Sequence, residues 1–386
     1  MLRRVLTGLA ASAVTPALLL VALEVGLRLF GIGDDAMAEP HPWVGWVHLP
    51  SLRAELRSED PALGRRMSVT TDSLGLRDVE RAAAKPPGAY RVLVLGDSFV
   101  EGCQVPFDSV LTRRMERLLD GAGGRRVEVW NCGVAGYSTA QEYLYLRMVA
   151  ARFHPDLVVL CFLASNDVAD DVPRLATSLR NRVFFRLESD SLVLDRSYCR
   201  PDPPVVGWLR LHSRCFGWVT TEIRVVHLRL QQRAADQGGA GGVPPALQIY
   251  AEHPDSLWSR AWNITERLVV ATRDESARQG AAFILVSIAN GAQVHSEGRV
   301  DRPGWETWGR LPGLVLDAPE ARLARLSQEH GLDYLPLLPA FREAAQRSGA
   351  PLHIDWSGHW NSAGHAVAAR AIAERIRARL ENSGPR

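Results

Sequence analysis

Lysine is almost missing from this 386-residue chain, where Lys85 is the only one and arginine supplies nearly all of the positive charge. Lysine and arginine together number 45, against 43 aspartate and glutamate residues, so the formal net charge is +2. A chain this close to neutral lacks the excess of positive charge with which nucleic-acid-binding proteins neutralise phosphates. The composition therefore predicts that no nucleic acid is a partner.

Long hydrophobic runs are also scarce. Only the run from Val5 to about Phe30 is long enough to cross a bilayer, which excludes a protein with several membrane spans. Two arginines, Arg3 and Arg4, precede it. Positive charge in this place favours a cytoplasmic N-terminus and an exported remainder.

Two interpretations of this run stay open. In the first, residues 1–32 are an uncleaved signal anchor, a transmembrane helix that holds a single-pass protein to the membrane with its catalytic domain on the exported side. In the second, a signal peptidase cleaves near Ala38, because Ala36-Met37-Ala38 has the small-x-small pattern that such enzymes need, and the protein is secreted.

Cysteines number only five, and an odd number outside the cytosol leaves at least one thiol free. Cys132 and Cys161 lie in or beside apolar, strand-like runs, which predicts that they pack as small hydrophobic side chains. Cys199 and Cys215 fall in one irregular segment and could form a disulfide.

Five short runs of β-branched and aliphatic residues predict strands, and longer helical patterns lie between most of them. The strands are expected at Arg91–Leu95, Val127–Trp130, Leu157–Phe162, Phe283–Ile288 and Asp333–Leu335. The helices are expected at Val110–Leu119, Ala140–Ala151, Ala261–Arg278, Pro319–His330 and Ser362–Leu380. Strands that alternate with helices indicate an α/β domain with a mostly parallel sheet and helices on both faces.

Three further segments interrupt or precede this alternation. Residues 33–88 are expected to form a polar, irregular, proline-containing lead-in that ends in the linker Lys85-Pro86-Pro87-Gly88. The α/β domain is expected over residues 89–384, with an insertion or lid at about 173–259 that contains the run Gly238–Gly242. No internal repeat is evident.

Polar side chains gather where the predicted strands end, and in an open α/β sheet ligands bind beyond the carboxyl ends of the strands. The first strand ends in Gly96-Asp97-Ser98, and the second leads into Asn131–Thr139, which contains Gly136. The third is followed by Asn166-Asp167, and Asp355 and His359 precede the last helix. These residues are expected to converge on one crevice.

Taken in order, these blocks resemble the SGNH (GDSL-type) hydrolase superfamily of esterases and lipases, over about residues 70–380. The segment Ser73–Asp78 resembles a membrane-anchored bacterial subgroup of that superfamily. The resemblance implies a three-layer α/β/α sandwich around a flavodoxin-like, mostly parallel sheet of five strands.

The resemblance also implies the site residues. Ser98 would be the nucleophile and His359 the base, with Asp355 holding the imidazole ring; the backbone N–H groups of Ser98 and Gly136 and the side-chain amide of Asn166 would form the oxyanion hole. The spacing departs from the family pattern, because Asp355 lies four residues before His359 and not two or three. Either the loop bulges by one residue, or a Ser–His dyad is supported by a backbone carbonyl.

The implied activity is cleavage of a carboxylic ester through an acyl-serine, on a small-molecule or glycan substrate; by analogy with the family, an O-acetyl group on an envelope or extracellular glycan is a candidate. A polysaccharide O-acetyltransferase and a catalytically silent carbohydrate-binding protein remain alternatives. No cofactor and no metal are expected, because the histidines near Asp355 (His353, His359 and His365) come without a His-Glu-x-x-His motif or a cysteine pair.

Overall fold

The structure is a computed structural model that describes residues 2–33, 36–200, 202–223, 226, 245–295, 313–355 and 357–382, with the side chains of the first helix described from Val14 onward. The glycine run predicted within the insertion, Gly238–Gly242, lies outside the described residues.

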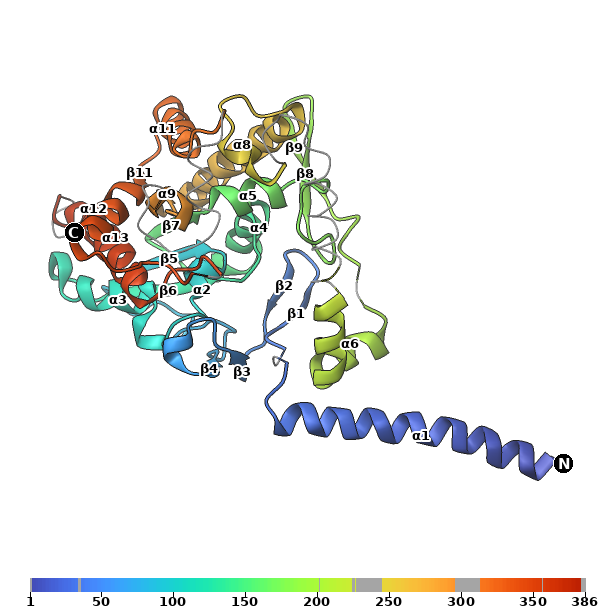
Figure 1. The fold of residues 1–386 in the computed structure, drawn as a ribbon. Coiled ribbons are helices and arrows are strands. Elements are labelled where there is room, and N and C mark those ends of the chain that lie inside the picture. The colour runs from blue at the N-terminus through green and yellow to red at the C-terminus, as the bar shows by residue number, and fades with distance from the viewer. Residues whose placement is uncertain are drawn as a thin grey trace.

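A five-stranded parallel sheet forms the centre of the molecule, in the order β11-β10-β7-β5-β6 (Figure 1). All five predicted strands are confirmed, with ends that differ by a few residues. Their bounds are β5 (Tyr90–Gly96), β6 (Val127–Gly133), β7 (Leu157–Phe162), β10 (Ala282–Ser287) and β11 (Tyr334–Pro336).

Helices cover both faces of the sheet, which makes three layers. Leu93 and Leu95 of β5 point into one core, which they share with α4 (Thr139–Met148), α8 (Ser256–Arg278) and α11 (Ala318–His330). Val92 and Val94, which alternate with them, point into a second core formed with α3 (Leu111–Leu119), α12 (Leu338–Ser348) and α13 (Ser362–Asn382). A sheet buried on both faces favours strands that are apolar at most positions, which explains the hydrophobic runs.

The lead-in is not irregular, so that prediction is wrong. It forms two antiparallel hairpins, β1 (Ala38–His41) with β2 (Gly45–His48) and β3 (Arg53–Arg57) with β4 (Arg66–Thr70). Side chains from it, among them Val44, Ala54, Val69 and Leu76, are buried. Strands of four or five residues are too short for an alternating pattern to stand out from the polar sequence around them.

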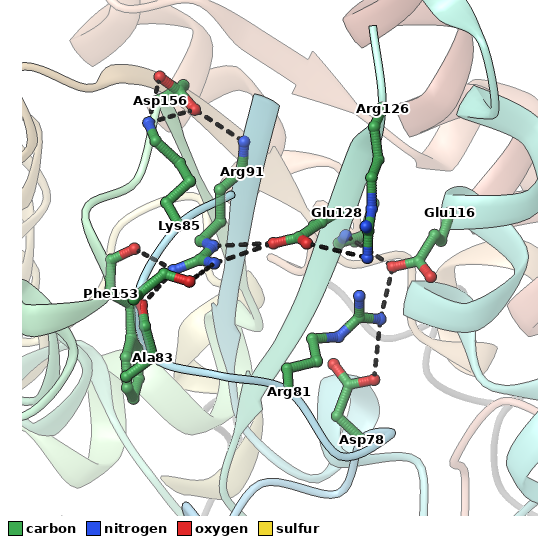
Figure 2. A network of polar contacts seen from close by, with 12 residues as sticks. Asp78, Arg81, Ala83, Lys85, Arg91, Glu116, Arg126, Glu128, Phe153 and Asp156 are labelled. Carbon is green, nitrogen blue, oxygen red and sulfur yellow. Dashed lines mark hydrogen bonds and ion pairs between the residues drawn. The ribbon is translucent and has the colours of Figure 1, made fainter. Parts of the chain in front are cut away.

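The expected linker before β5 is fastened to the sheet by a network of ion pairs (Figure 2). The Lys85 ammonium lies 2.8 Å from Asp156. Arg91, which is fully buried, pairs with Glu128 at 3.0 Å and donates to the carbonyl oxygens of Ala83 and Phe153, both at 2.7 Å. A buried charge is tolerated only when it is paired and hydrogen-bonded in this way, so the end of the lead-in has a defined position on the domain.

The insertion contains a hairpin of β8 (Phe184–Glu188) and β9 (Ser191–Asp195), followed by α6 (Pro204–His212). Phe185 of this hairpin packs into the core beside α4 and α8. Cys199 and Cys215 are both free thiols, so the proposed disulfide between them is wrong. Cys132 and Cys161 are buried in the two cores, as predicted.

The first helix, α1 (Leu2–Leu29), extends away from the rest of the chain (Figure 1). Its leucines Leu18, Leu19 and Leu20 are 59–65% exposed. Near its end, the Glu24 carboxylate accepts hydrogen bonds from the backbone N–H groups of Arg214 and Cys215, at 3.0 and 2.8 Å. Among the residues that the structure describes, no helix is both long enough and apolar enough to span a bilayer.

Candidate active site

The nucleophile candidate lies in a tight turn between a strand and a short helix. β5 ends at Gly96, and Ser98 is the first residue of α2 (Ser98–Glu101). Asp97 caps this turn, because its Oδ1 accepts a hydrogen bond from the backbone N–H of Phe99 at 2.9 Å. Burial raises the pKa of Asp97. The cap holds Ser98 at the carboxyl edge of the sheet, half-buried and open to the crevice.

Two glycines shape the backbone beside α2: Gly133 is the last residue of β6, and Gly136 lies in the turn that follows. A Cβ at Gly133 would lie 2.4 Å from the backbone nitrogen of Glu101, so any side chain there would displace α2. Gly136 has a φ of +76°, which is accessible to glycine and strained for other residues. The second block of the sequence therefore needs glycine for close packing at one position and for backbone conformation at the other.

Ser98 and His359 meet in space although 261 residues separate them. The Ser98 Oγ lies 2.8 Å from the His359 Nε2, which is hydrogen-bond distance. The Phe99 ring packs against the imidazole, with their centroids 5.1 Å apart. A hydroxyl and an imidazole in this contact have the geometry in which the ring can take the hydroxyl proton.

The carboxylate on the other side of the imidazole belongs to Glu59 and not to Asp355. Glu59 Oε2 lies 2.8 Å from His359 Nδ1. Glu59 lies between β3 and β4, so the lead-in supplies this group. The expected contact from Asp355 to the ring is not among the described contacts, and the Asp355 side chain is exposed.

The loop around His359 explains why Asp355 does not reach the ring. The Ile354 N–H donates to the His359 carbonyl at 2.8 Å, and the Gly358 N–H donates to the Ile354 carbonyl at 2.8 Å. These bonds close the loop between residues 354 and 359 and leave residue 355 on its outer side. Of the two alternatives for the unusual spacing, neither is what the structure shows, because a carboxylate from a distant segment occupies the place.

Glu59 and His359 each stabilise the charged form of the other. Burial lowers the pKa of His359, but the hydrogen bond and the negative charge of Glu59 outweigh it, and the net pKa is raised. Burial likewise raises the pKa of Glu59, and the hydrogen bond and charge of His359 bring it below its usual value. Glu59 is therefore ionised at neutral pH and stabilises the imidazolium that proton transfer would create.

Nothing in the local sequence marks Glu59 as a site residue. It lies in the acidic stretch Ser58-Glu59-Asp60 of a segment that reads as irregular. The available signal was indirect: the spacing between Asp355 and His359 departs from the family pattern, which already indicated that the usual acid is out of place.

Hydrogen-bond donors point to the same region from three segments. Within the described residues, the backbone N–H groups of Ser98 and Gly136 have no acceptor. The Asn166 Nδ2, at the start of α5 (Ala164–Asp170), donates to Asp97 Oδ2 at 2.8 Å and to the Tyr137 carbonyl at 3.2 Å. The structure thus brings Asn166 and Ser98 together through Asp97, with Gly136 beside Tyr137.

A cavity of about 260 Å³ adjoins this group between the lead-in and the loops after α2 and β6. Its wall contains Glu59 and Ala135, the neighbours of His359 and Gly136 respectively. Its other polar groups include His48, Glu101 and Gln104, and the Trp46 indole forms part of its apolar wall. The cavity is small and its wall is mixed, with somewhat more apolar than polar surface, so it suits a compact group that carries hydrogen-bonding atoms better than a long acyl chain.

Together these groups have the chemistry of acyl transfer. A hydroxyl, an imidazole and a carboxylate stand in series, and the N–H groups of Ser98 and Gly136 are available as donors to the negative charge of a tetrahedral intermediate. No set of three or more histidine, cysteine, aspartate or glutamate side chains in the described ranges is arranged to hold a metal ion.

Comparison with solved structures finds three esterases at low identity. A two-domain esterase (CEX) active on acetylated mannans is 12% identical with a TM-score of 0.39; the match covers 77% of this chain and 51% of that chain, so this chain spans about half its length. An acetyl xylan esterase, AlAXEase, is 13% identical with a TM-score of 0.38, covering 74% and 99%. An acetylxylan esterase from Geobacillus stearothermophilus is 14% identical with a TM-score of 0.39, covering 74% and 94%.

No curated protein sequence matches this chain. The sequence profile of the GDSL-like Lipase/Acylhydrolase family matches residues 94–367, well over half of the chain. That match contains Ser98, Gly136, Asn166 and His359, and it begins after Glu59. The chain therefore belongs to the GDSL-like lipase and acylhydrolase family of esterases.

Proposed function

We propose that this protein is a serine esterase that cleaves a carboxylic ester through an acyl intermediate on Ser98. The observation that carries the proposal is the continuous series from Ser98 Oγ to His359 Nε2 and from His359 Nδ1 to Glu59 Oε2, with 2.8 Å at each contact. A serine hydroxyl is a weak nucleophile by itself and needs a base within this distance.

The proposed reaction has two halves. His359 takes the proton from Ser98 as its Oγ attacks the ester carbonyl, and Glu59 stabilises the imidazolium. The oxyanion receives hydrogen bonds from the free N–H groups of Ser98 and Gly136, and from the Asn166 amide once the substrate displaces one of its two acceptors, Asp97 or the Tyr137 carbonyl. The tetrahedral carbon then expels the alcohol, which His359 protonates. Water, activated by the same imidazole, attacks the acyl-serine and releases the acid.

We further propose a short acyl group, such as acetyl, on a polar alcohol such as a sugar. The small cavity beside Glu59 and Ala135 supports this, because it offers hydrogen-bonding groups and an indole face but little room for a long chain. An O-acetyl group on an envelope or extracellular glycan has this chemistry.

A fluorophosphonate probe and an acetyl-release assay test the proposal together. We expect the probe to label the wild-type protein at Ser98, and we expect acetylated glycans and short-chain p-nitrophenyl esters to release free acid. Transfer of the acetyl group to an added glycan, with no acid released, would assign an acyltransferase instead. Absence of labelling at Ser98 would contradict the serine mechanism and favour a silent, carbohydrate-binding protein.

We also propose that α1 holds the protein to a membrane, with the esterase domain on the exported side. The described part of α1 supports this, because Leu18, Leu19 and Leu20 are exposed to a degree that is unusual for leucine unless another apolar phase covers them. Arg3 and Arg4 lie in the first turn of α1, before its apolar run, as expected for an anchored N-terminus.

Cell fractionation tests the anchor. The full-length chain should sediment with membranes and stay there through an alkaline carbonate wash, whereas a chain lacking residues 1–32 should be released. Recovery of the full-length protein in the soluble exported fraction, shortened by about 38 residues, would instead show signal-peptide cleavage near Ala38.

A further inference from the structure

In the backbone turn from Ala135 to Tyr137, all polar groups except the Gly136 N–H are hydrogen-bonded. We propose that Trp46 and Arg182 are positioning residues that fix this turn so that the Gly136 N–H is preorganised as an oxyanion donor. This inference rests on the proposed esterase function and adds two residues outside the four family blocks, one from the lead-in and one from the insertion.

A count of the hydrogen bonds in the turn leads to this proposal. The Ala135 N–H donates to Glu101 Oε1 at 3.3 Å, and the Tyr137 N–H donates to the Val134 carbonyl at 3.1 Å. The carbonyls of the turn accept from three side chains: Ala135 from Trp46, Gly136 from Arg182 and Tyr137 from Asn166. From the Ala135 N–H to the Tyr137 carbonyl, this leaves the Gly136 N–H as the backbone group without a partner among the described residues. Backbone polar groups in folded proteins are almost always paired, so a free donor in a fully held turn is consistent with a donor kept for the substrate.

Trp46, in β2, acts on the peptide group that contains this N–H. Its Nε1–H donates at 3.3 Å to the Ala135 carbonyl, which is the other end of the same peptide bond. A hydrogen bond to the carbonyl polarises the peptide and makes its N–H a stronger donor. The indole also blocks movement of the turn, because its Cζ2 lies 3.5 Å from the point where a Cβ of Gly136 would be.

Arg182 holds the next carbonyl. Its Nη2 donates to the Gly136 oxygen at 2.8 Å, and its Nη1 donates to Gln141 Oε1 at 2.8 Å. The guanidinium is 2% exposed and pairs with the buried Asp170 at 3.2 Å. A rotation of the turn that carried the Gly136 carbonyl away would cost a hydrogen bond to this buried charge, which makes the observed orientation strongly preferred.

The two side chains also contact each other. The Arg182 guanidinium lies over the Trp46 ring, 5.3 Å from its centroid, so each limits the freedom of the other. The Tyr137 hydroxyl donates to the Trp46 carbonyl and closes the arrangement from the opposite side. The turn is therefore fixed by hydrogen bonds from both the lead-in and the insertion.

The decisive variant is Trp46→Phe, which keeps an aromatic ring and removes only the N–H donor. Removal of a whole oxyanion donor costs about 10²–10³ in kcat, so we expect weakening of one donor to lower kcat about tenfold. KM for a p-nitrophenyl acetate substrate and the melting temperature should change little. Binding of a trifluoromethyl ketone, which forms a tetrahedral adduct on Ser98, should weaken by about the same factor as kcat/KM, because both depend on the oxyanion contact.

The lead-in offers a matched control for each variant. Trp43 lies three residues before Trp46, and the Arg196 guanidinium stacks over its ring at 4.4 Å while donating to the Pro42 carbonyl. This pair has the same chemistry but does not contact the oxyanion turn. Trp43→Phe and Arg196→Lys should therefore keep wild-type kcat and inhibitor affinity, whereas Trp46→Phe and Arg182→Lys should lose both together.

The outcomes separate this inference from the proposed function. If Trp46→Phe keeps wild-type kcat and inhibitor affinity while Ser98 is still labelled by the probe, the inference is wrong and the esterase function stands. If the wild type is not labelled, the function itself fails. If Arg182→Lys does not fold around Asp170, its melting temperature shows this, and Trp46→Phe decides alone.

Discussion

Replacement of Ser98 by alanine is expected to lower kcat for p-nitrophenyl acetate by at least about 10³-fold, because no other group is placed to form the acyl intermediate. The remaining rate would come from the oxyanion donors and substrate binding alone. KM should change little, since Ser98 Oγ contributes to bond formation more than to binding. Steady-state kinetics on purified protein, with the melting temperature measured beside it, checks this result.

A matched serine variant gives the control. Ser348 lies at the end of α12 and is exposed, and its hydroxyl bonds only to nearby backbone: it donates to the Ala344 carbonyl at 2.9 Å and accepts from the Ala350 N–H at 3.2 Å. Ser348→Ala should keep full activity and full labelling by a fluorophosphonate. An Ser98→Ala protein that still hydrolyses the ester at the wild-type rate would overturn the assignment of the nucleophile.

Replacement of Glu59 by glutamine is expected to lower kcat by about 10²–10⁴-fold, in the range seen when a catalytic histidine loses its carboxylate partner. Glutamine keeps the size of the side chain but not the charge that stabilises the imidazolium. The same change at the residue that the family pattern would predict, Asp355→Asn, should leave kcat near the wild-type value, because Asp355 is exposed and lies outside the contacts of His359. The two variants measured side by side decide which carboxylate serves the site.

The pH profile supplies a second readout of Glu59. Glu59 raises the pKa of His359, and the ring must be neutral to act as a base, so wild-type kcat/KM should fall as pH drops through that raised pKa. In Glu59→Gln the pKa of His359 decreases, and the acid limb should shift to lower pH while the plateau falls. In Asp355→Asn the limb should not move. A shift in Asp355→Asn, with none in Glu59→Gln, would reverse the assignment.

The lead-in has a larger part in the site than the family match suggests. The match begins at residue 94, yet Glu59 and Trp46 come from the hairpins before it. The ion pairs of Lys85 and Arg91 fasten the end of this segment to the sheet. A truncated protein that begins at residue 89 should therefore lack both the Glu59 carboxylate and the Trp46 hydrogen bond to the oxyanion turn.

The sequence by itself determined the sheet and the nucleophile turn. Strands that are buried on both faces are apolar at most positions, so β5, β6, β7 and β10 can be recognised in the sequence as short hydrophobic runs. The Gly96-Asp97-Ser98 turn and the order of the four blocks depend on local chemistry: a glycine where packing is tight, a cap for the first helical turn, and a histidine near the last helix. These requirements act over a few residues and leave a pattern in the chain.

Only the tertiary structure decided which carboxylate serves His359 and what holds the oxyanion turn. Glu59 and Trp46 reach the site from the two hairpins of the lead-in and Arg182 reaches it from the insertion. Contacts between such distant segments leave no periodicity in the sequence at the residues that they bring together. Asp355 shows the converse, since the hydrogen bonds between Ile354, Gly358 and His359 turn a carboxylate close in sequence outward. Asp355 is near His359 in the sequence, but Glu59 is the carboxylate near its imidazole in space, and proton transfer depends on that distance.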